Sequence, residues 1–479
     1  MVWKTHLRRL RPVAPALPLA LVAAAVLLHC GTDDATSPSP STDGGGSVCV
    51  TDGATQPVDA AQPVDGGAAA LDPISRYALQ MVAEGRTTFR YDTFGDEAFW
   101  GDTLKLHRAI NGSAKGGVGA GVSPKTALAV GLKVDVDALP AMVLDVFEHG
   151  RVNLDSVDTT LTLWKARAVV GVTGVFDTGG ALVSMGIQCS LCHSTVDDSL
   201  TAGVGHRLDG WANRDLDVGA IVNLSPDLSA VTALLGVPEA TVRTVLTGWG
   251  PGHFNAQLFL DGKALGPDAG AAEAAALIPP AFGLGAVNMA TYTGFGSSTY
   301  WNAFVANLEM HGKGTFVDSR LADATQFPVS AAAGFANVRS TPDLITSKLP
   351  ALQFYQLAIP APAPPAGSFD AAGAGRGKMV FEGAAKCASC HVAPLFTEPG
   401  WNMHTGAEIG IDDFQSDRSP EKRYRTTPLR GLWTHAKGGF YHDGRFPTLN
   451  AVVNHYDVAQ SLSLTAAQKS DLVEYLKSL

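Results

Sequence analysis

Apolar residues recur at helical spacing in several stretches of the chain, and the clearest stretch begins near residue 72. Asp72 and Pro73 are residue types favoured at the N-cap and the first position of a helix, and Gly85 predicts the end of this helix. The apolar positions of the stretch are Ile74, Tyr77, Ala78, Met81 and Val82. Their i, i+3, i+4 spacing predicts an amphipathic helix with one buried face.

Further helical patterns are shorter and are separated by glycine-rich stretches. They cover residues 103–110, 140–148, 241–246 and 375–385. A last pattern closes the chain, where Thr465 and Gln468 form a capping box. The apolar face of that helix consists of Leu472, Tyr475, Leu476 and Leu479. Strands, for example over residues 168–172, are expected only locally, so the pattern predicts a mainly α protein with long loops.

The longest apolar run, residues 13–28, follows four basic side chains and matches an export signal over residues 1–29. The run ends in Leu-Leu-His-Cys, which resembles a bacterial lipobox, in which the cysteine, here Cys30, is lipidated. The alternative is ordinary cleavage nearby, which would leave Cys30 as a free thiol. We therefore expect a protein of the periplasm or cell envelope, attached to a membrane only through this lipid.

Two segments of biased composition predict the domain boundaries. Residues 30–70 are rich in Ser, Pro, Asp, Gly and Ala, so they predict a disordered linker, and Cys49 within them is interpreted as an isolated thiol. Residues 359–367 are rich in proline and predict a second linker. The predicted domains are then residues 71–358 and residues 368–479.

The overall composition fits a globular protein and argues against one class of partner. Of the 479 residues, 46% are hydrophobic, which is enough for a sizeable core. The 45 acidic side chains outnumber the 35 Lys and Arg, and the formal net charge is −10. Because binding to nucleic acid depends on neutralising phosphates with basic side chains, we expect no nucleic-acid partner. An acidic surface favours a basic protein partner instead.

Two C-x-x-C-H motifs indicate the chemistry of the chain. They are Cys189-Ser190-Leu191-Cys192-His193 and Cys387-Ala388-Ser389-Cys390-His391. Two thiols at this spacing add to the two vinyl groups of haem, and the histidine that follows is the proximal iron ligand. A zinc ribbon would need its cysteine pairs about 15–20 residues apart, and a thioredoxin-type motif requires no histidine. The sequence therefore predicts two covalently bound c-type haems.

The helical pattern before the second motif and the C-terminal helix suit the crossing first and last helices of a cytochrome c fold. We therefore expect a mainly α fold with two cytochrome c-like haem domains and long loops. The region before the proline-rich linker is too long for a minimal cytochrome c, so the first domain is expected to be enlarged.

Residues beyond the second motif resemble a known family. Thr427-Pro428-Leu429-Arg430-Gly431-Leu432, Tyr441-His442-Asp443-Gly444 and Thr448-Leu449 resemble the C-terminal domain of bacterial di-haem cytochrome c peroxidases and of the related MauG-type enzymes. In the peroxidases, a methionine fourteen residues after that histidine binds the iron of the electron-transfer haem. Tyr456 stands at this position here, as a tyrosine does in the MauG-type enzymes. The resemblance therefore implies Tyr456 as an iron ligand, with a core aromatic role or ligation by His455 as the alternatives.

The same resemblance implies a role for His206, thirteen residues beyond His193. The peroxidases have a displaceable distal histidine in the first domain shortly after the attachment site, whereas the MauG-type enzymes leave this iron position open. His253 and His311 are lesser candidates. The resemblance is sharp over residues 373–479, looser over residues 185–316 and absent before residue 71.

Aromatic and acidic residues between the two motifs are candidates for catalysis. Trp249, Trp301 and Phe316 could relay electrons or line the first haem pocket, or else belong to the core. Glu273 or Glu309 could supply the carboxylate that moves protons during peroxide cleavage. The spacing of Trp301 and Phe316 after the first motif is also similar to that in the di-haem rubber oxygenases.

These features together predict an exported di-haem oxidoreductase of the peroxidase/MauG superfamily. The first haem would reduce hydrogen peroxide, or use it to oxidise a substrate, and the second haem would pass on electrons from a donor protein. One alternative is a non-enzymatic electron-transfer cytochrome with both irons permanently six-coordinate. The other is a dioxygenase that acts on an apolar substrate.

Overall fold

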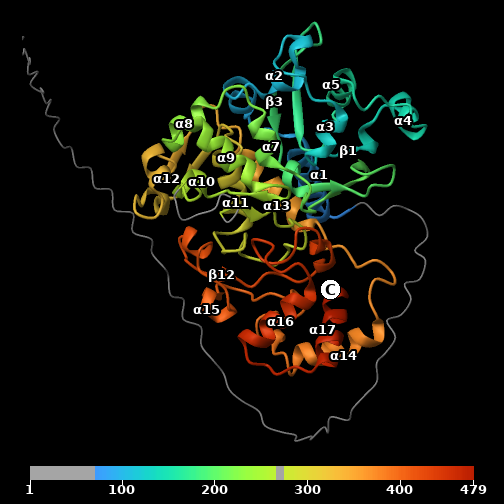
Figure 1. The fold of residues 1–479 in the computed structure, drawn as a ribbon, viewed down its shortest axis with the longest axis vertical. Coiled ribbons are helices and arrows are strands. Elements are labelled where there is room, and N and C mark those ends of the chain that lie inside the picture. Colours follow the sequence, from blue (N-terminus) through green and yellow to red (C-terminus); the bar gives the residue numbers. More distant parts are fainter. Residues whose placement is uncertain (1–70, 266–273) are drawn as a thin grey trace, which may run out of the picture. The chain divides into compact units, whose positions relative to one another are not determined.

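Helices make up most of the regular structure in the computed structural model, which describes residues 71–265 and 274–479 (Figure 1). The prediction of a mainly α chain is confirmed for these residues. The predicted export signal, Cys30, Cys49 and the linker over residues 30–70 lie outside the described residues. No helix within the described ranges is long and apolar enough to cross a membrane.

Most helices are short, and the longest opens the described part of the chain. The helices before the second haem motif are α1 (Pro73–Tyr91), α2 (Leu106–Asn111), α3 (Pro124–Ala129), α4 (Ala141–Glu148), α5 (Val157–Lys165), α6 (Ser190–His193), α7 (Val218–Asn223), α8 (Ser229–Leu235), α9 (Glu239–Trp249), α10 (Leu258–Asp261), α11 (Ser298–Phe304), α12 (Pro328–Ala333), α13 (Leu349–Ala358) and α14 (Ala371–Glu382). Those after it are α15 (Gly406–Ile409), α16 (Leu449–Ala459) and α17 (Ala466–Lys477).

The strands are short, and each sheet among the described residues has two of them. The strands are β1 (Val134–Asp135), β2 (Val172–Phe176), β3 (Leu182–Ile187), β4 (Ser194–Val196), β5 (Val204–Gly205), β6 (Arg207–Asp209), β7 (His253–Phe254), β8 (Ala276–Leu277), β9 (Thr315–Val317), β10 (Asn337–Arg339), β11 (Met403–His404) and β12 (Tyr424–Arg425). The strand expected over residues 168–172 instead begins at Val172, because β2 pairs with β3 directly before the first haem motif.

Helix α1 begins where the sequence predicts and ends later. The Asp72 side chain accepts hydrogen bonds from the backbone N–H groups of Ile74 and Ser75 at 2.9 and 3.1 Å. The helix continues through Gly85, so the predicted end at this glycine is wrong. A Cβ atom at Gly85 would lie 1.8 Å from the carbonyl oxygen of Ala351 in α13. The glycine therefore allows two helices to pack closely rather than ending one of them.

Helices α14 and α17 also pack through a glycine. A Cβ atom at Gly377 in α14 would lie 2.0 Å from the carbonyl oxygen of Asp471 in α17. Both halves of the capping box at Thr465 and Gln468 are present, which confirms the predicted start of α17. The close packing of the helix before the second motif against the last helix is also confirmed, and it forms one side of the second haem region.

The proline-rich segment 359–367 is packed against both neighbouring regions. The Gly283 N–H donates to the carbonyl oxygen of Ile359 at 2.9 Å, and the Trp433 indole N–H donates to that of Pro362 at 3.2 Å. The described residues, 71–265 and 274–479, group into one compact unit by their contacts. The division into haem domains at this segment stays a prediction.

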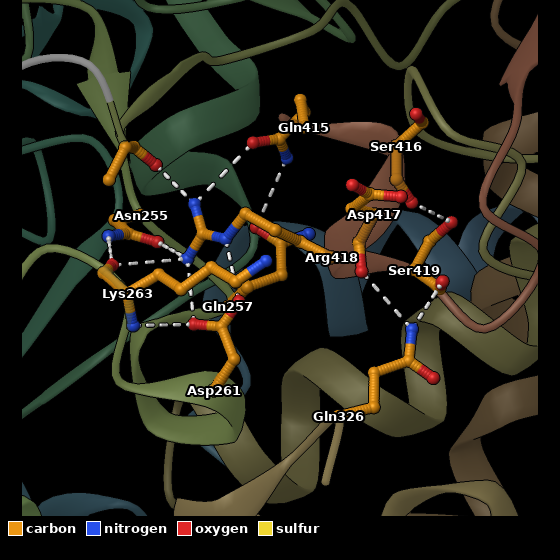
Figure 2. A network of polar contacts seen from close by, with 11 residues as sticks. Asn255, Gln257, Asp261, Lys263, Gln326, Gln415, Ser416, Asp417, Arg418 and Ser419 are labelled. Carbon is orange, nitrogen blue, oxygen red and sulfur yellow. Dashed lines mark hydrogen bonds and ion pairs between the residues drawn. The ribbon is translucent and has the colours of Figure 1, made fainter. Parts of the chain in front are cut away.

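A buried polar network joins residues 255–263 and Ala274 to residues 415–419 (Figure 2). The Arg418 guanidinium is completely buried and forms an ion pair with Asp261, with Nε and Oδ2 2.7 Å apart. Further donors of Arg418 reach the Asn255 side-chain oxygen and the Ala274 carbonyl oxygen, each at 2.6 Å. The network therefore fastens the segment after the second motif to the region that carries the first.

Candidate haem sites

The first C-x-x-C-H motif lies directly after β3, where the chain turns into the short helix α6. The His193 Nδ1–H donates to the carbonyl oxygen of Pro279 at 3.1 Å. This bond fixes the ring and leaves Nε2 for a metal, as is usual for histidine ligands. Burial lowers the pKa of His193 to about 4, so its imidazole is neutral at physiological pH, which iron binding requires.

The thiols of the first motif line a cavity together with His193. The cavity has a volume of about 260 Å³, whereas a single water needs about 10–15 Å³, so it is much larger than a packing defect. Burial raises the pKa values of Cys189 and Cys192 to about 12, which keeps them as thiols rather than the thiolates that bind zinc. Two thiols and a neutral imidazole on one largely apolar cavity fit a covalently attached haem.

The second motif repeats this arrangement in a different local structure. Cys387 opens a single 3₁₀ turn, Cys387–Ser389, and the His391 Nδ1–H donates to the carbonyl oxygen of Phe396 at 2.9 Å. Burial lowers the pKa of His391 as well. Cys387, Cys390 and His391 line a cavity of about 690 Å³. This site also fits a haem.

Several side chains that can bind iron face the second cavity. They are His404, His435, His442, Tyr292, Tyr424, Tyr441 and Tyr456. Tyr456 lies on α16, and burial raises its pKa, with smaller contributions from the Cys387 and Cys390 thiols. The predicted ligand is therefore close to the second motif. Its role as a ligand stays a prediction.

His455, the alternative to Tyr456, is directed elsewhere. Its Nε2–H donates to the carbonyl oxygen of Ile409 at 2.8 Å, and the ring does not line the second cavity. His404 lines the cavity, but its Nε2 is 2.7 Å from a Glu398 carboxylate oxygen. The second cavity therefore offers Tyr456 rather than His455 as the ligand from α16.

His206 does not reach the first cavity, which corrects the prediction that it is a distal ligand. It lies between β5 and β6, and the Val204 and Arg207 side chains on either side are buried. The chain bends at His206 between the two strands, and the side chain points outward into solvent. Its Nδ1 pairs with an Asp137 carboxylate oxygen at 2.9 Å, and 58% of the side chain is exposed.

The predicted aromatic candidates are divided between two cavities. Trp301 on α11 lines the first haem cavity and stacks on Phe304, with ring centroids 4.6 Å apart. Trp249 ends α9 and lines only a smaller apolar cavity of about 40 Å³. Phe316 belongs to a separate apolar cluster, and His253 lines neither haem cavity. Glu273 lies outside the described residues.

Glu309 is the carboxyl group that the structure brings to the first cavity. It lines both this cavity and the small apolar one, and neither of its side-chain oxygens has a hydrogen-bond partner among the described residues. Burial raises its pKa well above the usual value, which favours the protonated carboxyl group. His311 also lines the small cavity, where its ring stacks on Phe99 with centroids 3.7 Å apart.

Several polar residues of the cavities were not found by sequence reasoning. Tyr292 and Arg425 line both haem cavities, so they form part of a shared wall. Gln257 and Gln415 line the first cavity and belong to the network around Arg418. One signal in the sequence could have found Arg425. It lies two residues before Thr427, where the segment with the family resemblance begins.

Comparison with curated proteins finds a partial relative. The chain is 32% identical over 124 residues to the methylamine utilization protein MauG of Methylorubrum extorquens. The match covers 22% of this chain and 35% of MauG, so the chain spans about a third of the length of the curated relative it matches. A search of protein families finds no family that matches the chain.

Two solved structures are similar to parts of the chain. One is a MauG-like protein associated with microbial copper homeostasis, with 20% identity, a TM-score of 0.23, and coverage of 28% of this chain and 56% of that one. The other is Kuenenia stuttgartiensis hydrazine synthase, with 24% identity, a TM-score of 0.21, and coverage of 32% and 62%. Over the matched stretch the chain is therefore similar, at low identity, to a MauG-type cytochrome.

Proposed function

We propose that the chain is an exported di-haem c-type cytochrome that reduces hydrogen peroxide, or uses it to oxidise a substrate, at the first haem site. Electrons would pass through the second site. The observation that carries this proposal is the difference between the two cavities. Among the described residues, the first contains a buried carboxyl group without a hydrogen-bond partner, Glu309, and no histidine except His193. The second is surrounded by several histidines and tyrosines.

This difference assigns different roles to the two sites. An iron whose sixth position is filled is suited to electron transfer, whereas an open position permits reaction with peroxide. Tyr456 can fill that position at the second site, which leaves the first site as the reactive one. When bound, the haems supply the redox chemistry.

The residues of the chain bind, orient and deliver protons. Cys189 and Cys192 hold the cofactor in the first cavity, and the bond from His193 to Pro279 fixes the proximal ligand. Burial raises the pKa of Glu309 and favours its protonated form, in which it can act as a general acid toward a bound peroxide oxygen. The apolar walls limit the entry of water and so direct this proton to the substrate.

The cellular setting is part of the same proposal. Covalent haem attachment in bacteria is completed outside the cytoplasm, which agrees with an export signal over residues 1–29. A lipid on Cys30 would hold the protein at a membrane of the cell envelope. The net charge of −10 favours a basic electron-donor protein.

Glu309→Gln tests the proposed peroxide chemistry. The change keeps the shape of the side chain and removes its transferable proton, so we expect peroxide turnover to fall by about 10²- to 10⁴-fold. The visible and EPR spectra of Glu309→Gln, recorded after reduction by one electron per molecule, should match those of the parent protein. Glu382→Gln, which removes an exposed partner of Lys378 on α14, is the matched control and should retain turnover.

Two other results would contradict the proposal. Turnover by Glu309→Gln at the parent rate would remove this residue from the mechanism. Two low-spin haems in every redox state of the parent, unchanged by peroxide, would identify a non-enzymatic electron carrier.

Tyr456→Phe tests the proposed ligand of the second haem. Loss of the hydroxyl removes the only atom of this side chain that can bind iron, so we expect the low-spin EPR signal of the parent protein to change. Tyr475→Phe on α17 removes a hydroxyl from the same region, where its ring packs on Phe381, and should leave the signal unchanged. An unaltered spectrum in Tyr456→Phe would reduce this residue to core packing.

A further inference from the structure

Two arginines in the interior have no carboxylate partner within the described residues. Arg214 is only 6% exposed, and its Nε and Nη1 atoms are buried without a hydrogen-bond partner. The hydrogen bonds of the Arg425 side chain go to two backbone carbonyl oxygens. The fully buried Arg418, by contrast, pairs with Asp261 at 2.7 Å.

Both arginines lie beside Tyr292. Their positive charges act to lower the pKa of this tyrosine, against the larger effect of burial, which raises it. Tyr292 and Arg425 line the first and the second haem cavity at once. Arg214 also contributes to the lowered pKa of His435, which lines the second cavity. Arg425 is therefore located at the wall that the cavities share, whereas Arg214 lies next to Tyr292 and lines neither cavity.

The positive charges of these two arginines require a negatively charged group nearby. A guanidinium does not lose its proton in proteins, and burying it without a counter-charge is strongly unfavourable. The motifs show that each cavity fits a haem, and each c-type haem keeps two propionate carboxylates. Arginine binds carboxylates through paired N–H groups with favourable geometry.

We propose that Arg425 binds a haem propionate at this shared wall and that Arg214 adds a second positive charge beside it. The inference rests on the proposed haem content of the two cavities. Reduction of an iron adds negative charge to the site, so a neighbouring guanidinium favours the reduced state. It also favours the ionised form of the propionate. The arginines would therefore raise the reduction potentials and keep them independent of pH near neutrality.

Arg425→Gln and Arg214→Gln test this inference by redox titration followed in the visible spectrum. In each variant we expect a lower reduction potential. We also expect the potential to depend more steeply on pH, because the unpaired propionate now takes up a proton on reduction. Arg425 lines both cavities, so Arg425→Gln should affect both haems. The thioether bonds keep the haems attached, and intact mass measures their number.

Two further variants separate the possible outcomes. Arg425→Lys restores the charge and should recover part of the potential, which a purely structural role would not explain. Arg376→Gln removes the same charge from an exposed pair with Asp471 and should change neither the potentials nor their pH dependence. Parent-like potentials and pH dependence in both glutamine variants, with two haems attached, would overturn this inference alone. A parent protein without covalent haem would overturn the proposed function instead.

Discussion

Replacing Cys189 and Cys192 together by alanine is expected to leave one covalent haem on the protein and to abolish peroxide turnover. Both thiols line the first cavity, and no other described cysteine lies there to form a thioether. The protonation of these buried thiols at neutral pH fits their addition to vinyl groups. Haem staining after denaturing electrophoresis and intact mass would measure the loss directly.

The second motif provides the matched comparison. Alanine at Cys387 and Cys390 should also leave one haem, but it should remove the site through which electrons enter. The first haem of that variant should still change its spectrum when peroxide is added to the reduced protein, while steady turnover with a protein donor stops. Alanine at Cys49 should leave both haems in place. Peroxide turnover that survives loss of the first haem would show that the roles of the two sites are assigned wrongly.

Local signals account for what the sequence predicts correctly. The Asp72 cap, the capping box of Thr465 and Gln468, and the two haem motifs each involve residues within a few positions of one another. Such patterns depend on hydrogen bonds and covalent chemistry that need little tertiary context. They were sufficient to predict helix starts and to select the cysteines and the histidine that line each cavity together.

The failures have tertiary causes. Gly85 is a typical helix end by sequence, but its missing Cβ is used for the contact with α13. His206 follows the first motif at a distance that resembles a distal ligand, yet the paired strands on either side turn its side chain outward. In both cases, residues far away in the sequence determine the local structure, and a local sequence pattern contains no information about them.

The polar residues of the cavities illustrate the same limit. Glu309 follows His193 by more than a hundred residues, and Arg425 reaches the first cavity from beyond the second motif. Sequence alone left Glu309 as one of two carboxylate candidates and gave no reason to select Arg425. Their burial, and the absence of partners for Glu309 among the described residues, are what give them chemical meaning.

Arg418→Met is expected to destabilise the protein more than any other single substitution in the network around Arg418. It would leave the Asp261 carboxylate, only 1% exposed, without its counter-charge. Removing one partner of a buried ion pair costs about 3–5 kcal/mol. Denaturant unfolding, with the first-haem spectrum recorded in parallel, would measure this loss in free energy of unfolding.

The same substitution should also disturb the first haem site. Gln415 accepts a hydrogen bond from Arg418 and donates one to Gln257, and both glutamines line the first cavity. Loss of the guanidinium would remove a hydrogen bond that positions these glutamines. The spectrum of the first haem should therefore change before global unfolding begins. The second-haem spectrum should remain that of the parent, because neither glutamine lines the second cavity.

Three comparisons isolate the ion pair. Arg376→Met breaks an exposed pair with Asp471, and we expect it to change the free energy of unfolding much less than Arg418→Met does. Arg418→Lys keeps the charge but loses the forked contact, so it should restore stability only in part. Asp261→Asn combined with Arg418→Met should cost less than the sum of the two single changes, because the double variant buries no unpaired charge. If Arg418→Met unfolded as easily as Arg376→Met, the network of Figure 2 would not hold the two segments together.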